Sequence, residues 1–271
     1  MLAVSDILLF GILGITAGTL AGMLGIGGGM VIVPGLFYLF GVIGLPETTL
    51  MHMAAGTAMG IMVFTSAAST WSHHARGDVQ WMMFRQVVPA IGTGVVLGNL
   101  FSNRLDTHWL EIIFGVFLML VAIKIATAWT PSFEETDTPS RGFTAAIGSL
   151  IGLKSGILGI GGGAISVPFL LYCGLPMKAA SGTSASFTLP IALVGTVAFS
   201  LFSPTYPEIN WSTGYVYWPA IALVAPFTML GAPIGTVLSH RIPADRLKRI
   251  FALLLVFIGL RMLGGSLRYL V

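Results

Sequence analysis

The chain carries the same pattern of seven glycines twice, with the two copies 134 positions apart. The first copy ends in the triple glycine 27–29, and the second ends in the triple glycine 161–163. When residues 14–38 are compared with residues 148–172, 13 of the 25 positions are identical. This period is far longer than the roughly 20 to 50 residues of a solenoid repeat, so the pattern indicates that a whole half of the chain is duplicated.

Shorter matches continue the correspondence beyond the glycines. They pair Gly56-Thr57 with Gly182-Thr183, Trp81 with Trp211, and Pro89-Ala90 with Pro219-Ala220. A polar segment with two prolines and several carboxylates separates the two copies. We therefore predict a first repeat over residues 1–129, a linker over 130–141 and a second repeat over 142–271, all within one membrane domain.

The composition indicates which solvent surrounds this chain. Hydrophobic residues make up 55% of it and charged residues only 8%, which is typical of a protein embedded in a lipid bilayer. Apolar runs lie near 5–24, 30–45, 50–72, 82–101, 109–129, 142–158, 160–175, 182–203, 214–239 and 250–267. Five runs per half predict an all-α polytopic membrane protein of eight to ten helices, in which the short runs after the triple glycines are half-helices or re-entrant segments.

The charged loops give a prediction about orientation. The loop at 240–249 is rich in arginine and lysine, which favours the cytoplasmic side, whereas the matching loop of the first half carries only Arg104. This difference indicates that equivalent loops face opposite sides of the membrane. We therefore predict inverted repeats, an arrangement that can expose one central site to each side in turn.

The triple glycines are predicted to break their helices. Three successive residues without side chains weaken a helix and allow backbone angles that other residues avoid. A helix that restarts at such a break presents free N–H groups and the positive end of its dipole, which together attract an anion. Two copies would direct two such ends at one site near the middle of the bilayer, the alternative being a purely structural kink. The predicted binding glycines are Gly25, Gly27, Gly28, Gly29, Gly159, Gly161, Gly162 and Gly163.

Polar side chains near the breaks complete the predicted site. The matched pair Thr57 and Thr183, together with Ser184, can donate hydrogen bonds to an anion, although such hydroxyls in apolar helices often bond a carbonyl one turn back instead. Lys154 lies two positions before a glycine of the second motif, where it either faces the anion or extends toward an interface. His52 is a candidate for coupling transport to protons.

Signals for other kinds of chemistry are missing from the sequence. The glycine-rich segments do not match the phosphate loop, the dinucleotide fingerprint or the nucleophile elbow, so we predict no catalytic residues and no cofactor. No histidine or cysteine cluster has the spacing of a metal site, and Cys173 is the single cysteine. We expect no carboxylate inside the membrane and no nucleic-acid partner.

Each half contains the motif G-x-x-G-x-G-G-G followed by an apolar run and a proline, with a Gly-Thr pair about 20 to 30 positions further on. This doubled motif resembles the TauE/SafE family of sulfite and organosulfonate exporters, also described as the four-toluene sulfonate uptake permease family. The resemblance implies a secondary-active, multi-pass transporter of the bacterial inner membrane that exports small sulfur-containing or organic anions, such as sulfite or sulfoacetate, by alternating access.

The resemblance leaves two other functions open. An anion channel could use the same glycine site, and an intramembrane enzyme is a weaker alternative, since no Ser-His or paired-Asp arrangement is visible. The expected partners are a small anion, the lipid bilayer, a coupled proton or other ion, and a second copy of the chain in a homodimer.

Overall fold

A computed structural model describes the whole chain except residues 1–3, 25–27, 128–139, 205, 240–243 and 271. The described residues form ten α-helices and almost no sheet, which confirms the predicted all-α architecture. The helices are α1 (Val4–Leu24), α2 (Gly29–Val42), α3 (Leu50–Ala75), α4 (Trp81–Ser102), α5 (Thr107–Ala126), α6 (Arg141–Leu158), α7 (Gly163–Tyr172), α8 (Met177–Leu201), α9 (Trp218–Ser239) and α10 (Ala244–Leu270). A 3-10 turn, η1 (Glu47–Thr49), precedes α3, and a small hairpin of β1 (Ser212–Thr213) and β2 (Val216–Tyr217) precedes α9.

Six helical segments in the described part of the chain are long and apolar enough to cross a membrane, and they lie in α1, η1–α3, α5, α8, α9 and α10. Two apolar helices are much shorter, because α2 has 14 residues and α7 has 10. Their lengths of about 21 and 15 Å fall short of a hydrocarbon core of about 30 Å. The chain is therefore a multi-pass membrane protein that also contains two helices too short to cross.

Each short helix folds back along the helix before it. The rings of Phe10 in α1 and Phe40 in α2 lie 6.3 Å apart, so the end of α2 returns to the beginning of α1. Phe143 in α6 and Phe169 in α7 show the same relation, also at 6.3 Å. We call the pairs α1–α2 and α6–α7 the two re-entrant hairpins.

The tips of the re-entrant hairpins coincide with the glycine motifs. Helix α1 ends at Leu24 and α2 begins after Gly28, while α6 ends at Leu158 and is followed by Gly159. Gly28 has a φ of 70° and Gly159 a φ of 68°, which is the left-handed region that only glycine enters at low cost. The predicted interruption of the helices is therefore present in both halves.

Glycine stripes hold each hairpin against a helix of the other half. A Cβ added at Gly14 would lie 2.6 Å from Cβ of Phe227 in α9, and one added at Gly22 would meet Ala232 further along α9. In the same way Gly148 packs on Val87 of α4, and the glycines that follow it continue along that helix. Helix α1 thus runs parallel to α9, and α6 runs parallel to α4. In both pairs the two backbones lie closer together than larger side chains would allow.

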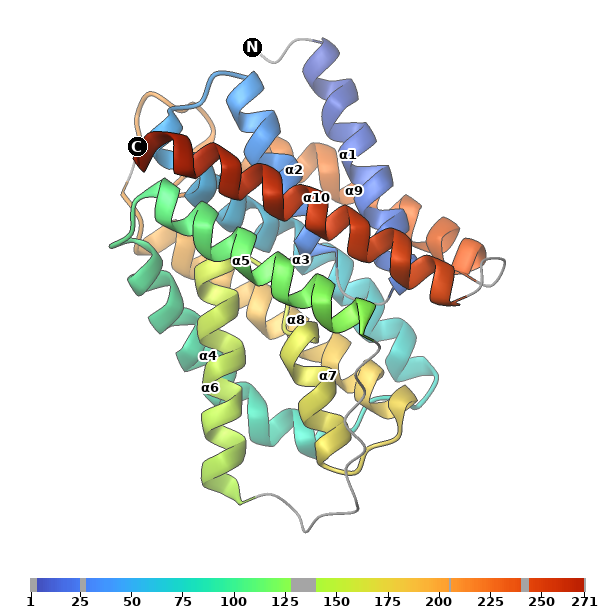
Figure 1. Cartoon of the computed structure of the whole chain (residues 1–271). Coiled ribbons are helices and arrows are strands. Elements are labelled where there is room, and N and C mark those ends of the chain that lie inside the picture. Colours follow the sequence, from blue (N-terminus) through green and yellow to red (C-terminus); the bar gives the residue numbers. More distant parts are fainter. Residues whose placement is uncertain (1–3, 25–27, 128–139, 205, 240–243, 271) are drawn as a thin grey trace.

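Two pairs of helices, each with one member from either half of the chain, run in opposite directions. In α3 and α8, Gly56 lies beside Phe199 while the later Gly60 lies beside the earlier Thr196, so these two helices are antiparallel. Helices α5 and α10 are antiparallel as well, since Gly115 packs against Leu263 while the later Met119 packs against the earlier Gly259. Figure 1 shows the same relation for the re-entrant hairpins, which enter from opposite ends of the molecule.

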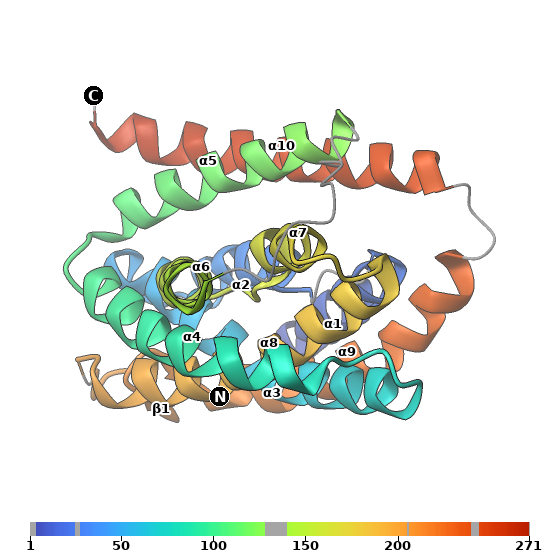
Figure 2. The same ribbon diagram turned by 90° about the horizontal axis from the view of Figure 1, so that it is seen from below.

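Figure 2 shows how the helices are layered around the re-entrant hairpins. Helices α5 and α10 cross one face of the molecule, and a layer containing α3 and α9 covers the opposite face. The hairpins lie between these layers, so their glycine tips are surrounded by protein. Backbone that departs from regular helix is tolerated at membrane depth only in such a protected setting or beside a polar cavity.

The packing gives a different register for α4 and α9 than the sequence comparison gave. Gly94 of α4 packs on Ser149, and Gly231 of α9 packs on the matching Ile15. Equivalent positions are then 137 apart, so that Trp81 corresponds to Trp218 and Pro89 to Pro226, rather than to Trp211 and Pro219. The reason is the length of the connection before α9, which includes the β1–β2 hairpin and shifts the register.

The first testable prediction concerns the contact between α6 and α4. Replacing Gly152 with leucine should lower stability by about 3 kcal/mol, because a Cβ there would overlap the carbonyl oxygen of Ile91, which belongs to a backbone that cannot move aside. Thermal unfolding of the detergent-solubilised protein measures the effect. Gly142→Leu is the matched control, since no atom lies within 4 Å of a Cβ at that position; equal melting temperatures for the two variants would contradict the prediction.

Candidate functional site

The tips of the two re-entrant hairpins meet inside the protein. A Cβ added at Gly29 would lie 3.2 Å from Cα of Ile160 and 3.0 Å from Sδ of Met62 in α3. Gly28, Gly29 and Ile160 are all buried. The two breaks thus form one junction, which we call the tip junction, and they do not face lipid.

The helices that leave the tip junction present their amino-terminal ends to it. In α2, the N–H groups of Val31 and Ile32 bond to the carbonyl of Gly28 at 3.0 Å. In α7, the N–H groups of Ile165 and Ser166 bond to the carbonyl of Gly162 at 3.1 Å. The N–H groups of the residues just before these form no intrahelical hydrogen bond. They point out of the amino-terminal end of the helix, which is the positive end of its dipole and favours a nearby anion.

Two lysines reach the start of α7. Lys154 of α6 donates from Nζ to the carbonyl oxygen of Gly161 at 2.7 Å, and its ammonium lies 5.3 Å from the centre of the Phe117 ring. Lys124 of α5 donates to the carbonyl oxygen of Ala164 at 3.1 Å. Lys154 was predicted from its position beside the glycine motif, whereas Lys124 was missed. The available signal was an ionisable residue inside an apolar run.

Hydroxyl groups add donors on the same side of the tip junction. The Oγ atoms of Ser166 in α7 and Ser184 in α8 are 2.6 Å apart, and both residues are buried. A Cβ at Gly162 would lie 3.4 Å from the Oγ of Ser166, and a Cβ at Gly161 would lie 3.1 Å from the Oγ1 of Thr188. Ser184 is a predicted site residue, while Ser166 and Thr188 were missed.

The first tip is chemically different from the second. The groups that a Cβ at Gly28 would meet are Cβ of Ala21, Cδ1 of Ile32 and the carbonyl of Ala17, so the side chains there are apolar. The charged and hydroxyl side chains gather around the second tip. The polar side chains of the tip junction therefore lie mainly near the start of α7.

Asn99 of α4 is a further polar residue that the sequence did not single out. It is fully buried, and among the described residues neither its side-chain nitrogen nor its oxygen has a hydrogen-bond partner. Its backbone nitrogen lies close to Gly156, three positions before the α6 break. A buried amide without a partner costs about 1 to 3 kcal/mol, so Asn99 is a candidate contact for a polar solute.

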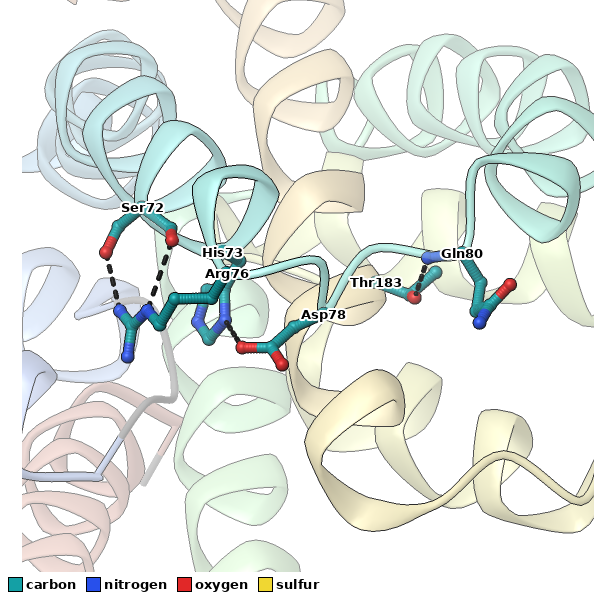
Figure 3. Close-up of polar contacts among 6 residues, drawn as sticks. All are labelled: Ser72, His73, Arg76, Asp78, Gln80 and Thr183. Atoms are coloured by element: carbon teal, nitrogen blue, oxygen red, sulfur yellow. Dashed lines mark hydrogen bonds and ion pairs between the residues drawn. The ribbon is translucent and has the colours of Figure 1, made fainter.

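The hydroxyls of the matched threonines accept hydrogen bonds from the backbone just before two other helices. The Oγ1 of Thr57 accepts a hydrogen bond from the N–H of Tyr217 at 3.0 Å, directly before α9. The Oγ1 of Thr183 accepts one from the N–H of Gln80 at 2.9 Å, directly before α4, as Figure 3 shows. Each threonine of α3 or α8 therefore fixes the start of a helix that belongs to the other half.

His52 is also held by structural contacts. Its Nε2 lies 3.1 Å from the carbonyl oxygen of Ser102, its Nδ1 lies 3.4 Å from the Oγ1 of Thr107, and its ring stacks on Tyr215 at 4.7 Å. The imidazole is thus fixed at the start of α3 by α4, α5 and the hairpin before α9. No contact joins it to the glycine motifs within the described residues.

Some predictions fall on residues that the structure does not describe. These are Gly25 and Gly27 of the first motif, most of the linker 130–141 and the first part of the basic loop 240–249. Glu111 of α5, which the sequence analysis did not single out, is only 5% exposed. The sequence placed Glu111 in an apolar run, but burial depends on α10, which lies far away in the chain.

The second prediction concerns the contact shown in Figure 3. Thr183→Val should lower stability by about 1 kcal/mol, because valine keeps the shape of the side chain but leaves the part-buried N–H of Gln80 without its acceptor. Thermal unfolding measures this change. Thr196→Val on the same helix is the control, since the hydroxyl of Thr196 bonds only the carbonyl of Ala192 one turn back. If both variants unfold at the wild-type temperature, the hydroxyl of Thr183 has no such role.

The long apolar helices and the two re-entrant hairpins with their buried polar tip junction are typical of a membrane transporter. The family model described as "Sulfite exporter TauE/SafE" matches residues 10–262. The chain belongs to this family, as its sequence motifs predicted.

Three relatives from distant organisms match this chain over nearly all of their own length, and their descriptions begin with "Probable membrane transporter protein". The relative from Haemophilus influenzae is 36% identical over 263 residues, which cover 94% of this chain and 97% of the relative. A relative from Methanocaldococcus jannaschii is 26% identical over 254 residues, which cover 93% of each chain, and one from Bacillus subtilis is 24% identical over 271 residues, which cover 93% of this chain and 95% of the relative. No solved structure matches the chain.

Proposed function

We propose that the protein is a secondary-active transporter that exports small sulfur-containing or organic anions, such as sulfite, sulfoacetate or a related sulfonate, across the bacterial inner membrane. The observation that carries this proposal is the tip junction, where two oppositely directed hairpins bring the starts of α2 and α7 together. The family's description, "Sulfite exporter TauE/SafE", supports export of a sulfur-containing anion.

The proposed anion site uses main-chain N–H groups, which suit an anion of small size. Glycine at positions 161 and 162 allows a solute to approach the backbone at the start of α7 closely. Lys154 adds a positive charge and Ser184 a hydroxyl donor on the same side. The proposed binding set comprises the glycines of both motifs together with Lys154 and Ser184, while Thr57 and Thr183 shape the site through the helices that they cap.

The reciprocal packing of the halves supports a transport cycle by alternating access. Each hairpin packs on a helix of the other half, and each matched threonine caps a helix of the other half. We propose that 1–129 and 142–271 are inverted repeats, so that two arrangements of similar energy exist and expose the tip junction to opposite sides. An ion gradient or the gradient of the anion itself would supply the energy.

Transport by the purified protein in proteoliposomes tests the proposal. We expect saturable uptake of radiolabelled sulfite that excess sulfoacetate or thiosulfate inhibits and acetate inhibits less. Counterflow should also occur, in which an unlabelled anion inside the vesicle drives accumulation of the labelled anion. A current that does not saturate and the absence of counterflow would instead indicate a channel. No transport of any of these anions would contradict the proposal.

The expected homodimer and the expected coupling to an ion gradient each have a test of their own. The expected homodimer can be measured by light scattering of the protein in detergent, where the protein component should have twice the mass of one chain. Coupling to an ion gradient is measured in the same proteoliposomes, by imposing pH and sodium gradients one at a time.

A further inference from the structure

The contact between α5 and α10 contains a buried carboxylate that the proposed anion site does not use. Glu111 lies in the second turn of α5 and is 5% exposed. Its Oε2 accepts a hydrogen bond from the Oγ of Ser266 in α10, and its Oε1 lies 3.9 Å from the Nδ1 of His108. A carboxyl group in a membrane-crossing helix is costly to bury and usually has a functional role.

We propose that Glu111 is the proton-binding site that couples anion transport to a pH gradient. This inference rests on the proposed transport function and names the coupling ion. One proton binds to the carboxylate and gives a neutral carboxyl group, and the same proton leaves later in the transport cycle. No other bond forms or breaks.

The surroundings of Glu111 suit a group that changes its charge. The ring of His108 on the same helix lies beside the carboxylate, and the hydroxyl of Ser266 can donate to the carboxylate or accept from the carboxyl group. Glu47 of η1 and Tyr38 of α2 interact electrostatically with Glu111, and Arg261 of α10 interacts with Tyr38.

Two more ionisable side chains lie on helices that pack against α5. His52 of α3 is fixed by Ser102 and Thr107, and Lys154 of α6 bonds to Gly161 at the tip junction. Among the described residues no lysine or arginine forms an ion pair with Glu111.

Helix α5 also connects this carboxylate to the tip junction. Lys124, 13 residues after Glu111 on the same unbroken helix, donates to the carbonyl oxygen of Ala164 in the first turn of α7. The two positions are about 20 Å apart along the helix axis. A movement of α5 against α10 on proton binding would therefore reach the start of α7, where the anion is proposed to bind.

The test compares two kinds of transport in Glu111→Gln, a variant that keeps the size of the side chain but cannot ionise. Accumulation of sulfite driven by a pH gradient should fall at least about tenfold, a typical size for a coupling effect. Sulfite counterflow at equal pH should stay within about twofold, since that exchange needs no change in protonation. Glu111→Asp should restore part of the pH-driven accumulation.

Asp78→Asn is the matched control, because Asp78 also pairs with a histidine, His73 at 3.3 Å, but on the partly exposed turn before α4 (Figure 3). The control should keep both kinds of transport. Wild-type accumulation by Glu111→Gln under a pH gradient would overturn the inference. An equal loss of both kinds of transport would also overturn it, because Glu111 would then only hold α5 on α10.

A second measurement does not depend on transport. The infrared difference spectrum between acidic and alkaline pH should contain the band of a buried protonated carboxyl group in the wild type, and Glu111→Gln should lack that band. Identical spectra would overturn the inference. Failure of the wild type to carry sulfite would contradict the proposed function alone, and the infrared spectrum would still decide whether Glu111 takes up a proton.

Discussion

Gly162→Leu is expected to abolish anion transport while the protein still folds and inserts into the membrane. A Cβ at this position would lie 3.1 Å from Cγ2 of Ile151 and 3.1 Å from Cδ1 of Ile191, which are flexible ends of side chains that can move aside. The rest of the leucine would then occupy the space at the start of α7. Loss of about 3 kcal/mol of anion binding corresponds to about a hundredfold, so uptake of sulfite in proteoliposomes should fall by at least that factor.

Gly92→Leu is the control for a leucine placed in a membrane helix. It lies in α4, and no atom lies within 4 Å of a Cβ at that position, so folding and transport should both remain normal. Elution of each variant as a single species from a gel-filtration column checks its folding. Sulfite uptake by folded Gly162→Leu at the wild-type rate would contradict the site assignment.

Gly162 is a better target for this test than Gly28. At Gly28 the φ of 70° would cost leucine about 1 to 2 kcal/mol of backbone strain, so a loss of transport could result from unfolding. Gly162 has a φ of −72°, which leucine adopts freely.

Lys154→Met is the second variant with a large expected effect, and it acts on anion affinity. The ammonium group lies 2.7 Å from the carbonyl oxygen of Gly161, directly before the N–H groups that we propose hold the anion. At a separation of about 5 Å and an effective dielectric constant of about 20, two unit charges attract by about 3 kcal/mol. The dissociation constant for sulfite should therefore rise about a hundredfold.

Equilibrium binding of sulfite by calorimetry measures this change. Lys154→Arg keeps the charge and should bind within about tenfold of the wild type, because arginine matches the charge but not the shape of lysine. Lys178→Met removes a charge from an exposed position at the start of α8 and should leave affinity unchanged. Unchanged affinity in Lys154→Met would show that Lys154 serves only to hold the carbonyl of Gly161.

Local sequence patterns predicted much of the fold. The ten apolar runs correspond to the ten described helices, and the triple glycines mark the two places where helices break. Both features depend on neighbouring residues, because helix length follows from the apolar run and the break follows from consecutive glycines. The closeness of Lys154 to the second motif follows from the chain in the same way, since Gly161 is only seven positions further along.

Contacts between distant helices could not be predicted in this way. Thr57 and Thr183 were correctly matched to each other, but their partners Tyr217 and Gln80 are 160 and 103 residues away. The burial of Glu111 depends on Ser266, 155 residues further along the chain. Such contacts depend on how ten helices pack together, and this packing leaves no periodic signal in one sequence.

The most direct test of the tip junction as an anion site is an experimental structure of the protein with bound sulfite. We predict density for one anion between the starts of α2 and α7, within hydrogen-bond distance of the N–H groups at Gly162 and Gly163 and within about 4 Å of the ammonium nitrogen of Lys154. An anion bound far from both glycine motifs, with the start of α7 empty at saturating sulfite, would contradict the account.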